Sequence, residues 1–265
     1  MDDPVINRQQ LLNWLRAARG EITVAGLFLT RLPFPATAGA PLPPLARTVW
    51  SFPLIGLLVG LISGAALMLA SKLSLHPLAC AMIALAVAAL VTGALHEDGL
   101  ADVVDGFGGG RLREDKLRIM RDSQIGTYGV LALIFSVGLR ASLVAGLLGP
   151  GLAAAALAGA AVLSRSLMPG IMVLMPQARV DGLAASAGRP TPRQAQLALG
   201  IGFVLAWPLL GFWAGCVAMI AALAATLLMA TIARRQIGGY TGDVLGASQQ
   251  AAEISILLTA GAFAL

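Results

Sequence analysis

Charged side chains are scarce in this chain. Only 12% of its 265 residues are Asp, Glu, Lys or Arg, whereas a soluble globular protein has about 25%. At the same time 58% of the residues are hydrophobic, and the mean hydropathy is +0.84. So few charges leave too little polar surface to cover a water-soluble domain of this length. The composition therefore favours an integral membrane protein.

Cysteine and aromatic residues are also few, and each shortage argues against a class of function. Cys80 and Cys216 both lie inside apolar stretches, so we expect neither a disulfide framework nor a zinc site. Aromatic residues make up only 5% of the chain and do not alternate with basic ones, so the net charge of +5 does not indicate a nucleic-acid partner. The first twenty residues lack an apolar core and do not resemble a secretory signal.

Long apolar stretches, by contrast, are frequent. A membrane-spanning helix needs roughly 20 mostly apolar residues, and seven stretches meet or approach this length. We therefore expect an all-α, polytopic helical bundle of about seven transmembrane helices, with residues 1–265 forming a single membrane-embedded domain. The seven stretches are 48–71, 77–96, 128–148, 151–175, 196–212, 213–233 and 247–265.

Basic residues are unevenly distributed between the connecting segments. Most of the 18 Lys and Arg residues lie before the first stretch or in segments 97–127, 176–195 and 234–246. Seven alternating spans would place these four segments on one face. Because loops rich in Lys and Arg stay in the cytoplasm, we expect the N-terminus on the cytoplasmic side and the C-terminus outside.

The N-terminal segment, residues 1–34, has the pattern of an amphipathic helix. Leu11, Leu15 and Ile22 belong to an apolar stripe with steps of three and four residues. The stripe is too short to span a bilayer, and Pro33 ends it. We predict a helix over residues 7–30 that lies in the plane of the membrane interface. A cytoplasmic helix packed on the protein is the alternative.

Residues 96–110, HEDGLADVVDGFGGG, carry the most informative pattern. On a helix, Asp98, Asp102 and Asp105 fall within about 60° of one another. Three carboxylates on one face repel each other unless a cation lies among them, and hard oxygen ligands favour Mg²⁺, Mn²⁺ or Ca²⁺. The alternative is a solvated acidic helix end. The glycines at 106–110 predict a tight turn after the motif, which phosphate groups could approach.

Two further polar clusters border the predicted cytoplasmic face. Arg121 and Asp122 directly precede the third stretch, where Asp122 can add a metal ligand and Arg121 can hold phosphate oxygens. Thr241 and Asp243 lie in the motif GGYTGDVLGA, residues 238–247, and Glu253 follows later in the last stretch. Asp243 can alternatively cap that helix. With the expected topology, the three clusters can converge on one site.

Three further residues are candidates because of where they lie. Arg140 and Arg165 are inside apolar stretches, where a cation is costly and usually functional. Arg165 is the better candidate for binding a substrate phosphate, whereas Arg140 can balance an internal acid. His96 adjoins the acidic motif and can be a general base, a group that orients a ligand, or a hydrogen-bonding group at a helix end.

Together these motifs resemble the adenosylcobinamide-GDP ribazoletransferase family, also called cobalamin-5′-phosphate synthase. The resemblance extends over nearly the whole chain from about residue 21. It rests on TRLPFP at 30–35, H-x-DGLAD-x-x-DG at 96–106, MRDS at 120–123, Ser164-Arg165, and GG-x-TGD-x-LGA at 238–247.

The resemblance implies a magnesium-dependent phosphotransferase in a bacterial inner membrane, with its site on the cytoplasmic side. Such an enzyme joins adenosylcobinamide-GDP to α-ribazole or its 5′-phosphate and releases GMP, near the end of cobalamin biosynthesis. The sequence leaves open whether it forms a homo-oligomer. Mg²⁺ would be held by Asp98, Asp102 and Asp105.

The remaining roles are hypotheses from the chemistry of the residues, made for the reaction that the resemblance implies. Asp105 or Asp122 would be the base, with His96 beside them, and Arg165 or Arg121 would stabilise charge in the transition state. The residues expected to bind substrate are Arg31, Arg121, Arg165, Thr241, Asp243 and Glu253.

Two other functions fit parts of the pattern. A CDP-alcohol phosphotransferase acting on lipid has a similar acidic helix, but the arginine after its DG-x-x-A pattern and its additional aspartates on a second turn are not found here. An ion-coupled transporter should carry its acidic residues in the middle of the bilayer, whereas these acids cluster at predicted helix ends.

Overall fold

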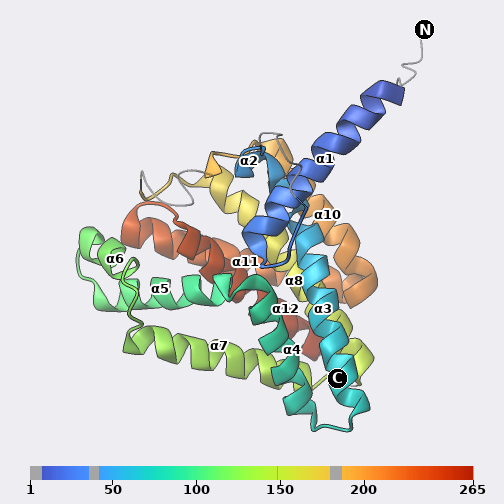
Figure 1. Cartoon of the computed structure of the whole chain (residues 1–265). Coiled ribbons are helices and arrows are strands. Elements are labelled where there is room, and N and C mark those ends of the chain that lie inside the picture. The colour runs from blue at the N-terminus through green and yellow to red at the C-terminus, as the bar shows by residue number, and fades with distance from the viewer. Residues whose placement is uncertain (1–7, 36–41, 148, 180–186, 265) are drawn as a thin grey trace.

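The chain folds as a bundle of helices, shown in Figure 1. The computed structural model describes residues 8–35, 42–147, 149–179 and 187–264. Within these ranges no β-strand forms, and the only bridge pairs Gln177 with Tyr240. The elements are α1 (Arg8–Leu29), α2 (Leu45–Thr48), the 3₁₀ turn η1 (Val49–Ser51), α3 (Phe52–Lys72), α4 (Pro77–Thr92), α5 (Leu95–Gly109), α6 (Arg113–Ile119), α7 (Thr127–Ala145), α8 (Pro150–Leu174), α10 (Pro192–Leu210), α11 (Phe212–Ile237) and α12 (Gly242–Ala264).

Helix α8 forms the centre of the bundle and packs against α3, α10 and α12. Most of its residues between Ala153 and Met172 are buried. Helix α3 approaches it through Gly56 and Gly60, where a Cβ atom would collide with the backbone of α8 at Ala161 and Ala158. Small residues at a spacing of four allow two helix backbones to pack closely in a membrane protein.

The polytopic helical architecture is confirmed, but the number of spans differs from the expected seven. Among the residues that the structure describes, four helical segments are long and apolar enough to cross a membrane, namely Leu45–Lys72, α7, α8 and α11. The bent pair of α4 and α5 makes a fifth if it counts as one span. Helices α10 and α12 form where apolar stretches were predicted, but polar residues such as Gln194, Gln249 and Glu253 make them less apolar.

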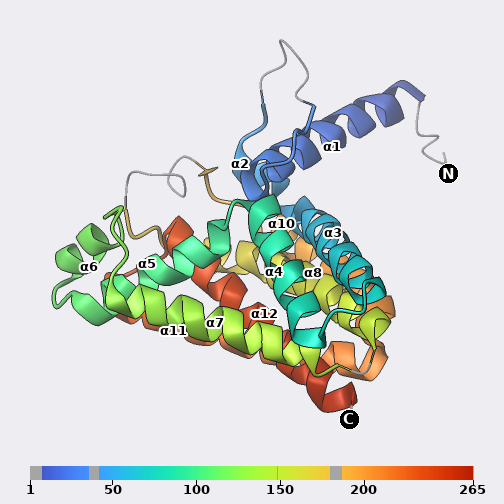
Figure 2. The same ribbon diagram turned by 60° about the horizontal axis from the view of Figure 1, so that its bottom comes forward.

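The stretch predicted at 77–96 is interrupted by a corner. Helix α4 ends at Thr92, α5 begins at Leu95, and their axes differ by 90°. Gly93 and Ala94 between them have φ angles of +66° and +54°, a left-handed conformation that glycine adopts readily. The corner directs α5 along α7 and α12 (Figures 1 and 2), so the acidic motif lies on a helix of its own.

The predicted tight turn begins at Gly110 rather than at Gly106, because α5 continues as far as Gly109 and α6 begins at Arg113. The glycines at the end of α5 allow close packing. A Cβ atom at Gly106 would lie 2.5 Å from Cγ of Met120, and one at Gly108 would lie 2.9 Å from Cδ2 of Tyr128. The bounds of the predicted stretches, 128–148 with 151–175 and 196–212 with 213–233, imply two helix breaks, and both are confirmed. They lie at Gly149 and Gly211, which have positive φ angles.

The predicted N-terminal helix is confirmed as α1. Its second half packs on the bundle, where Glu21 accepts hydrogen bonds from Trp50 Nε1 at 2.7 Å and Arg47 Nη2 at 3.1 Å. Its first half is exposed, including Trp14, and projects away from the other helices (Figures 1 and 2). Its place at a membrane interface stays a prediction. The first seven residues of the predicted 1–34 segment, and residues 180–186 of the basic segment 176–195, lie outside the described ranges.

Candidate active site

Two of the predicted motifs meet where α5 crosses the start of α12. Gly99 of α5 faces the backbone of Asp243, and a Cβ atom there would lie 2.8 Å from the Asp243 carbonyl oxygen. Gly246 of α12 faces His96, whose Cα would lie 3.2 Å from an added Cβ. The glycines of DGLAD and TGDVLG therefore allow the two backbones to approach, and this brings the acidic residues of both motifs together.

Asp98, Asp102 and Asp243 form the acidic centre of this crossing. Asp98 is exposed, and Asp102 is half-buried one helical turn later. Burial, together with the negative charges of Asp98, Asp243 and Asp105, raises the pKa of Asp102 to about 7, and the nearby charge of Arg179 opposes this rise. A cation placed among these carboxylates would relieve the repulsion.

Asp98 also lies at the junction of two cavities. One has a volume of about 200 Å³, and its walls include Phe28, Phe52 and Tyr240 together with His96. The other, of about 260 Å³, is bordered by Asp98, Asp102, Ala101, Met120, Arg121, Asp122, Ser123 and Ile125. Of the described residues, only Asp98 borders both. Two ligands could thus occupy the cavities and meet at one carboxylate.

Asp105 has a different environment from the other two aspartates of its helix. It is buried, and its Oδ2 and Oδ1 accept hydrogen bonds from the backbone N–H groups of Gly126 at 2.7 Å and Gly129 at 2.8 Å. Both donors belong to the first turn of α7, whose N–H groups have no partner within the helix. A Cβ atom at either glycine would collide with the carboxylate. Asp105 therefore fixes the start of α7 on α5.

The three predicted metal ligands do not form one cage in the structure. Within the described ranges, no group of three or more His, Cys, Asp or Glu side chains is arranged to hold a metal ion. Asp98 and Asp102 face the same cavity, whereas both Asp105 oxygens are used by backbone donors. A site based on the two carboxylates that border this cavity, those of Asp98 and Asp102, is what the geometry supports.

Thr241 and Asp243 have different structural roles at the start of α12. The Thr241 hydroxyl accepts a hydrogen bond from Val244 N–H at 3.3 Å and so caps the helix. It also donates to Asp243 Oδ2 at 3.0 Å. The capping role considered for Asp243 thus belongs to Thr241, and the Asp243 carboxylate instead pairs with Arg179 Nη2 at 3.0 Å.

Arg140, Arg165 and Glu253 belong to a buried network behind the cavities. Arg140 pairs with Glu97 and with Glu253, each at 3.1 Å, and its side chain is 3% exposed. Arg140 therefore balances internal acids, as the sequence indicated. Arg165 donates to the Ala161 carbonyl at 3.1 Å and lies 4.0 Å from Glu253. Neither Arg165 nor Glu253 borders the two cavities that meet at Asp98.

Glutamines and serines extend this network across four helices. The network joins α5, α7, α8 and α12, and it includes Glu97, the residue before Asp98 on α5. Gln250 donates to Glu97 at 3.2 Å and accepts from Ser136 at 3.1 Å, and Gln249 donates to Ser164 at 2.9 Å. Buried polar groups cost free energy unless they are paired, so these bonds hold the four helices in one arrangement.

His96 is 1% exposed and borders the 200 Å³ cavity. Its Nε2 has no hydrogen-bond partner in the described part of the chain. Burial, with the positive charges of Arg165 and Arg140, holds the pKa of His96 well below its ordinary value. The imidazole is therefore neutral, and Nε2 is available to a ligand.

The other residues predicted for the site differ in whether they border a cavity. Arg121 and Asp122 border the 260 Å³ cavity, and Asp122 Oδ1 accepts from Gln124 N–H at 3.0 Å. Arg31 borders neither cavity. Its backbone N–H donates to the Val91 carbonyl at 2.7 Å, and its guanidinium lies against Gly93 at the corner between α4 and α5.

Arg179 was missed by the sequence analysis. It appeared only as one of the basic residues in segment 176–195, yet it borders the 200 Å³ cavity and pairs with Asp243. Its position depends on the bridge between Gln177 and Tyr240, in which Ala178 N–H donates to the Tyr240 carbonyl at 2.8 Å. A contact between two loops has no sequence periodicity, so no local signal could have found it.

The basic segments do converge at one end of the bundle. Arg113 of α6 donates to the carbonyl of Ile237 at 2.9 Å and to that of Ala178 at 2.6 Å. One side chain thus joins segments 97–127, 176–195 and 234–246. The three predicted polar clusters are brought together by the two cavities at Asp98, one shared with Thr241 and Asp243 and the other with Arg121 and Asp122, whereas Glu253 borders neither.

Residues 21–261 match the family model described as cobalamin-5-phosphate synthase. The chain belongs to this family. A curated adenosylcobinamide-GDP ribazoletransferase from Bradyrhizobium diazoefficiens is 48% identical over 94% of this chain and 96% of its own length. Proteins of the same name from Rhizobium etli and a Sinorhizobium species are 45% and 46% identical, over 87% and 90% of this chain and 92% and 93% of their own lengths. No solved structure matches the chain.

Membership in the cobalamin-5-phosphate synthase family makes the chain a transferase of cobalamin synthesis. The matched range includes the acidic motif of α5, the start of α12 and the residues that border both cavities. The crossing of α5 and α12 is thus the candidate active site of this transferase.

Proposed function

We propose that the chain catalyses magnesium-dependent transfer of the adenosylcobinamide phosphate from adenosylcobinamide-GDP to α-ribazole or its 5′-phosphate. A ribose hydroxyl oxygen of ribazole forms a bond to the phosphorus next to the corrinoid side chain. The bond from that phosphorus to the GMP oxygen breaks, and GMP leaves. The position of Asp98 between two cavities carries this proposal, because a group transfer requires two substrates to meet at one phosphate.

The residues fit magnesium, although with fewer protein ligands than three aspartates would provide. Mg²⁺ is commonly bound by one or two carboxylates, with water and substrate phosphates completing its shell. Asp98 and Asp102 would supply these carboxylates, with Asp243 adding negative charge nearby. When bound, the metal would neutralise the diphosphate and stabilise the leaving GMP.

The chain's own residues would bind and orient the substrates. Arg121, at the edge of the 260 Å³ cavity, is suited to hold phosphate oxygens. Asp122 borders the same cavity and would take the proton of the attacking hydroxyl. The aromatic and apolar walls of the 200 Å³ cavity suit the flat base of ribazole, and neutral His96 would hydrogen-bond to it there.

Asp105, Arg165 and Glu253 would act indirectly in this scheme. Asp105 orients the start of α7, and the network of Arg165, Arg140 and Glu253 holds α5 and α12 in register. Their roles would be to position Asp98 and Asp243 rather than to contact substrate.

We further propose that the site faces the cytoplasm across a bacterial inner membrane. The basic segments converge beside the candidate site through Arg113. Lys and Arg in short loops remain on the cytoplasmic side, and a nucleotide-linked substrate would be available there.

The proposal is tested with the purified chain in lipid vesicles, supplied with adenosylcobinamide-GDP and α-ribazole. Asp98→Asn and Asp102→Asn should each lower GMP release about 100-fold or more, the scale for losing a preorganised electrostatic group. Glu114→Gln is the matched control, because Glu114 lies on α6 with a side chain that is 78% exposed. Binding of Mn²⁺, followed by electron paramagnetic resonance, should weaken in both aspartate variants. Unchanged GMP release in either variant, or full activity in EDTA, would contradict the metal assignment.

A further inference from the structure

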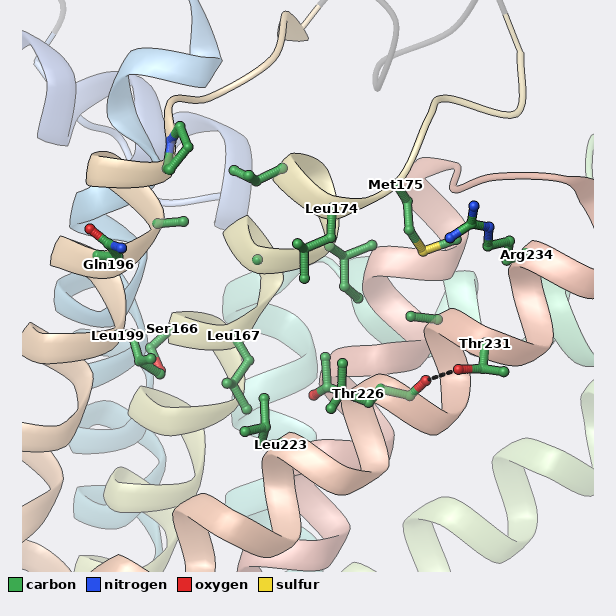
Figure 3. A pocket seen from close by; sticks show the side chains of 17 residues that line it. Ser166, Leu167, Leu174, Met175, Gln196, Leu199, Leu223, Thr226, Thr231 and Arg234 are labelled. Carbon is green, nitrogen blue, oxygen red and sulfur yellow. Dashed lines mark hydrogen bonds between the residues drawn. The ribbon is translucent and has the colours of Figure 1, made fainter.

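A cavity larger than the two that meet at Asp98 lies away from the candidate active site. Its volume is about 430 Å³, within the range of about 300–1,000 Å³ for ligand pockets. Helices α8, α10 and α11 form its walls (Figure 3). On α8 it is bordered by Leu167, Gly170 and Ile171, whereas Met168 and Met172 face the 200 Å³ cavity. The helix therefore separates the two spaces, and we call the larger one the lateral groove.

The walls of the lateral groove are mostly hydrocarbon. Leu174, Leu199, Leu223 and Leu227 line it, and each side chain is exposed in the chain alone. Two of its three helices, α8 and α11, are apolar enough to span a membrane. Leucine side chains on such helices face lipid tails rather than water, so a hydrocarbon chain is the ligand that these walls suit.

One positive charge stands at the edge of this apolar surface. Arg234 lines the groove, is exposed, and has no hydrogen bond or ion pair from its guanidinium within the described residues. Figure 3 shows Arg234 extending towards Met175, with Gln196 on the opposite wall. An apolar groove that ends at an unpaired arginine matches a ligand with a hydrocarbon tail and an anionic head.

A second polar group lies deeper in the wall. Thr226 of α11 is 4% exposed, and its hydroxyl has no hydrogen-bond partner in the described part of the chain. A neighbouring hydroxyl, that of Thr231, bonds to the Leu227 carbonyl at 2.7 Å instead (Figure 3). An ester oxygen near the head of a lipid could supply the partner that Thr226 lacks.

We propose that the lateral groove binds one anionic phospholipid, with an acyl chain between α10 and α11 and its phosphate at Arg234. The convergence of basic segments near the end of α11 places this phosphate on the same side of the bundle as the candidate active site. The site is separate from catalysis, because no residue of the groove borders the cavities at Asp98.

The test uses the whole chain in detergent, stripped of lipid and then mixed with phosphatidylglycerol, with retained lipid counted by native mass spectrometry. The original chain should retain one molecule. Arg234→Gln should lower the affinity about fivefold, the equivalent of about 1 kcal/mol for one basic residue at an anionic lipid surface. Arg235→Gln is the matched control: it removes the same charge from the next residue, which does not line the groove.

A second variant tests the groove without changing charge. A Cβ atom at Gly170 meets no heavy atom within 4 Å, so Gly170→Phe can fill the space without colliding with the backbone, and it should abolish retention. Retention as in the original chain by both Arg234→Gln and Gly170→Phe would overturn the proposal. So would equal loss in Arg235→Gln, or displacement of the lipid by α-ribazole 5′-phosphate but not by inorganic phosphate, which would assign the groove to a substrate.

Discussion

Arg179 and Asp243 form an ion pair of 3.0 Å across the border of the 200 Å³ cavity. The two residues are 64 positions apart and come from a loop and a helix start. Thr241 donates to the same Asp243 oxygen. The pair orients one carboxylate of the acidic centre and offsets part of the repulsion that it exerts on Asp102.

Removing the arginine should therefore disturb the acidic centre without unfolding the chain. We expect Arg179→Gln to lower GMP release by about 10- to 100-fold, the usual range for losing a group that positions a residue next to a metal site, because Asp243 loses the partner that orients it. The measurement is steady-state GMP release. Arg193→Gln, at an exposed arginine of α10, is the matched control. Equal effects of the two substitutions would show that only general loss of positive charge matters.

Substitution of Asp105 can distinguish a role in fixing the start of α7 from a role in metal binding. Asp105→Asn replaces an acceptor of two backbone N–H bonds by a group with only one acceptor oxygen. We expect a loss of about 1–3 kcal/mol in the free energy of unfolding and a small change in Mn²⁺ affinity. Thermal unfolding in detergent and a Mn²⁺ titration give the two quantities. If Mn²⁺ affinity falls as far as in Asp102→Asn, Asp105 is a ligand, as the sequence motif suggested.

The buried pairs of Arg140 give a prediction about stability. Arg140→Gln leaves Glu97 and Glu253 without their shared cation inside the bundle. We expect a loss of about 3–5 kcal/mol in the free energy of unfolding, because removal of one partner leaves buried charge uncompensated. The double variant Arg140→Gln with Glu253→Gln should recover part of this loss. Denaturation in mixed detergent micelles measures both, and a neutral single substitution would refute the network's role.

The shifted pKa of Asp102 predicts how stability depends on pH without metal. Its folded-state pKa is about 7, above the ordinary value of 3.8. The folded chain therefore keeps this proton over a range where the unfolded chain has lost it, so stability falls as pH rises from about 4 to about 7. In Asp102→Asn the part of this decrease in stability that is due to Asp102 should be absent. Melting temperatures in EDTA, measured across that range, provide the comparison.

Magnesium should restore the stability that the folded chain loses at alkaline pH. Above about pH 7 the repulsion at Asp102 is complete, and a ligand that binds only the folded chain raises its stability. We therefore expect Mg²⁺ to raise the melting temperature of the original chain at about pH 8, and to do so much less in Asp102→Asn. An identical rise in both proteins would place the metal elsewhere.

Much of the fold could be predicted because the length and composition of an apolar stretch are local properties of the sequence, and they determine where a long helix forms. The apolar stretches predicted the helices, and the ends of these stretches predicted the two breaks found at Gly149 and Gly211. The number of spans could not be obtained in this way. The 90° corner at Gly93 depends on packing of α5 against α7 and α12, and polar residues in α12 are tolerated because they pair with Glu97 and Ser164.

For the candidate site, the sequence by itself determined which residue types gather: carboxylates one turn apart on α5, and glycines that let α12 approach. A helical period places Asp98 and Asp102 on one face whatever surrounds them. Only the tertiary structure decided that Asp105 turns to the amides of α7, that Arg165 and Glu253 lie behind the site, and that Arg179 joins it. These partners come from segments far apart in the sequence. Hydrogen bonds between such segments produce no periodic pattern in the sequence from which they could be predicted.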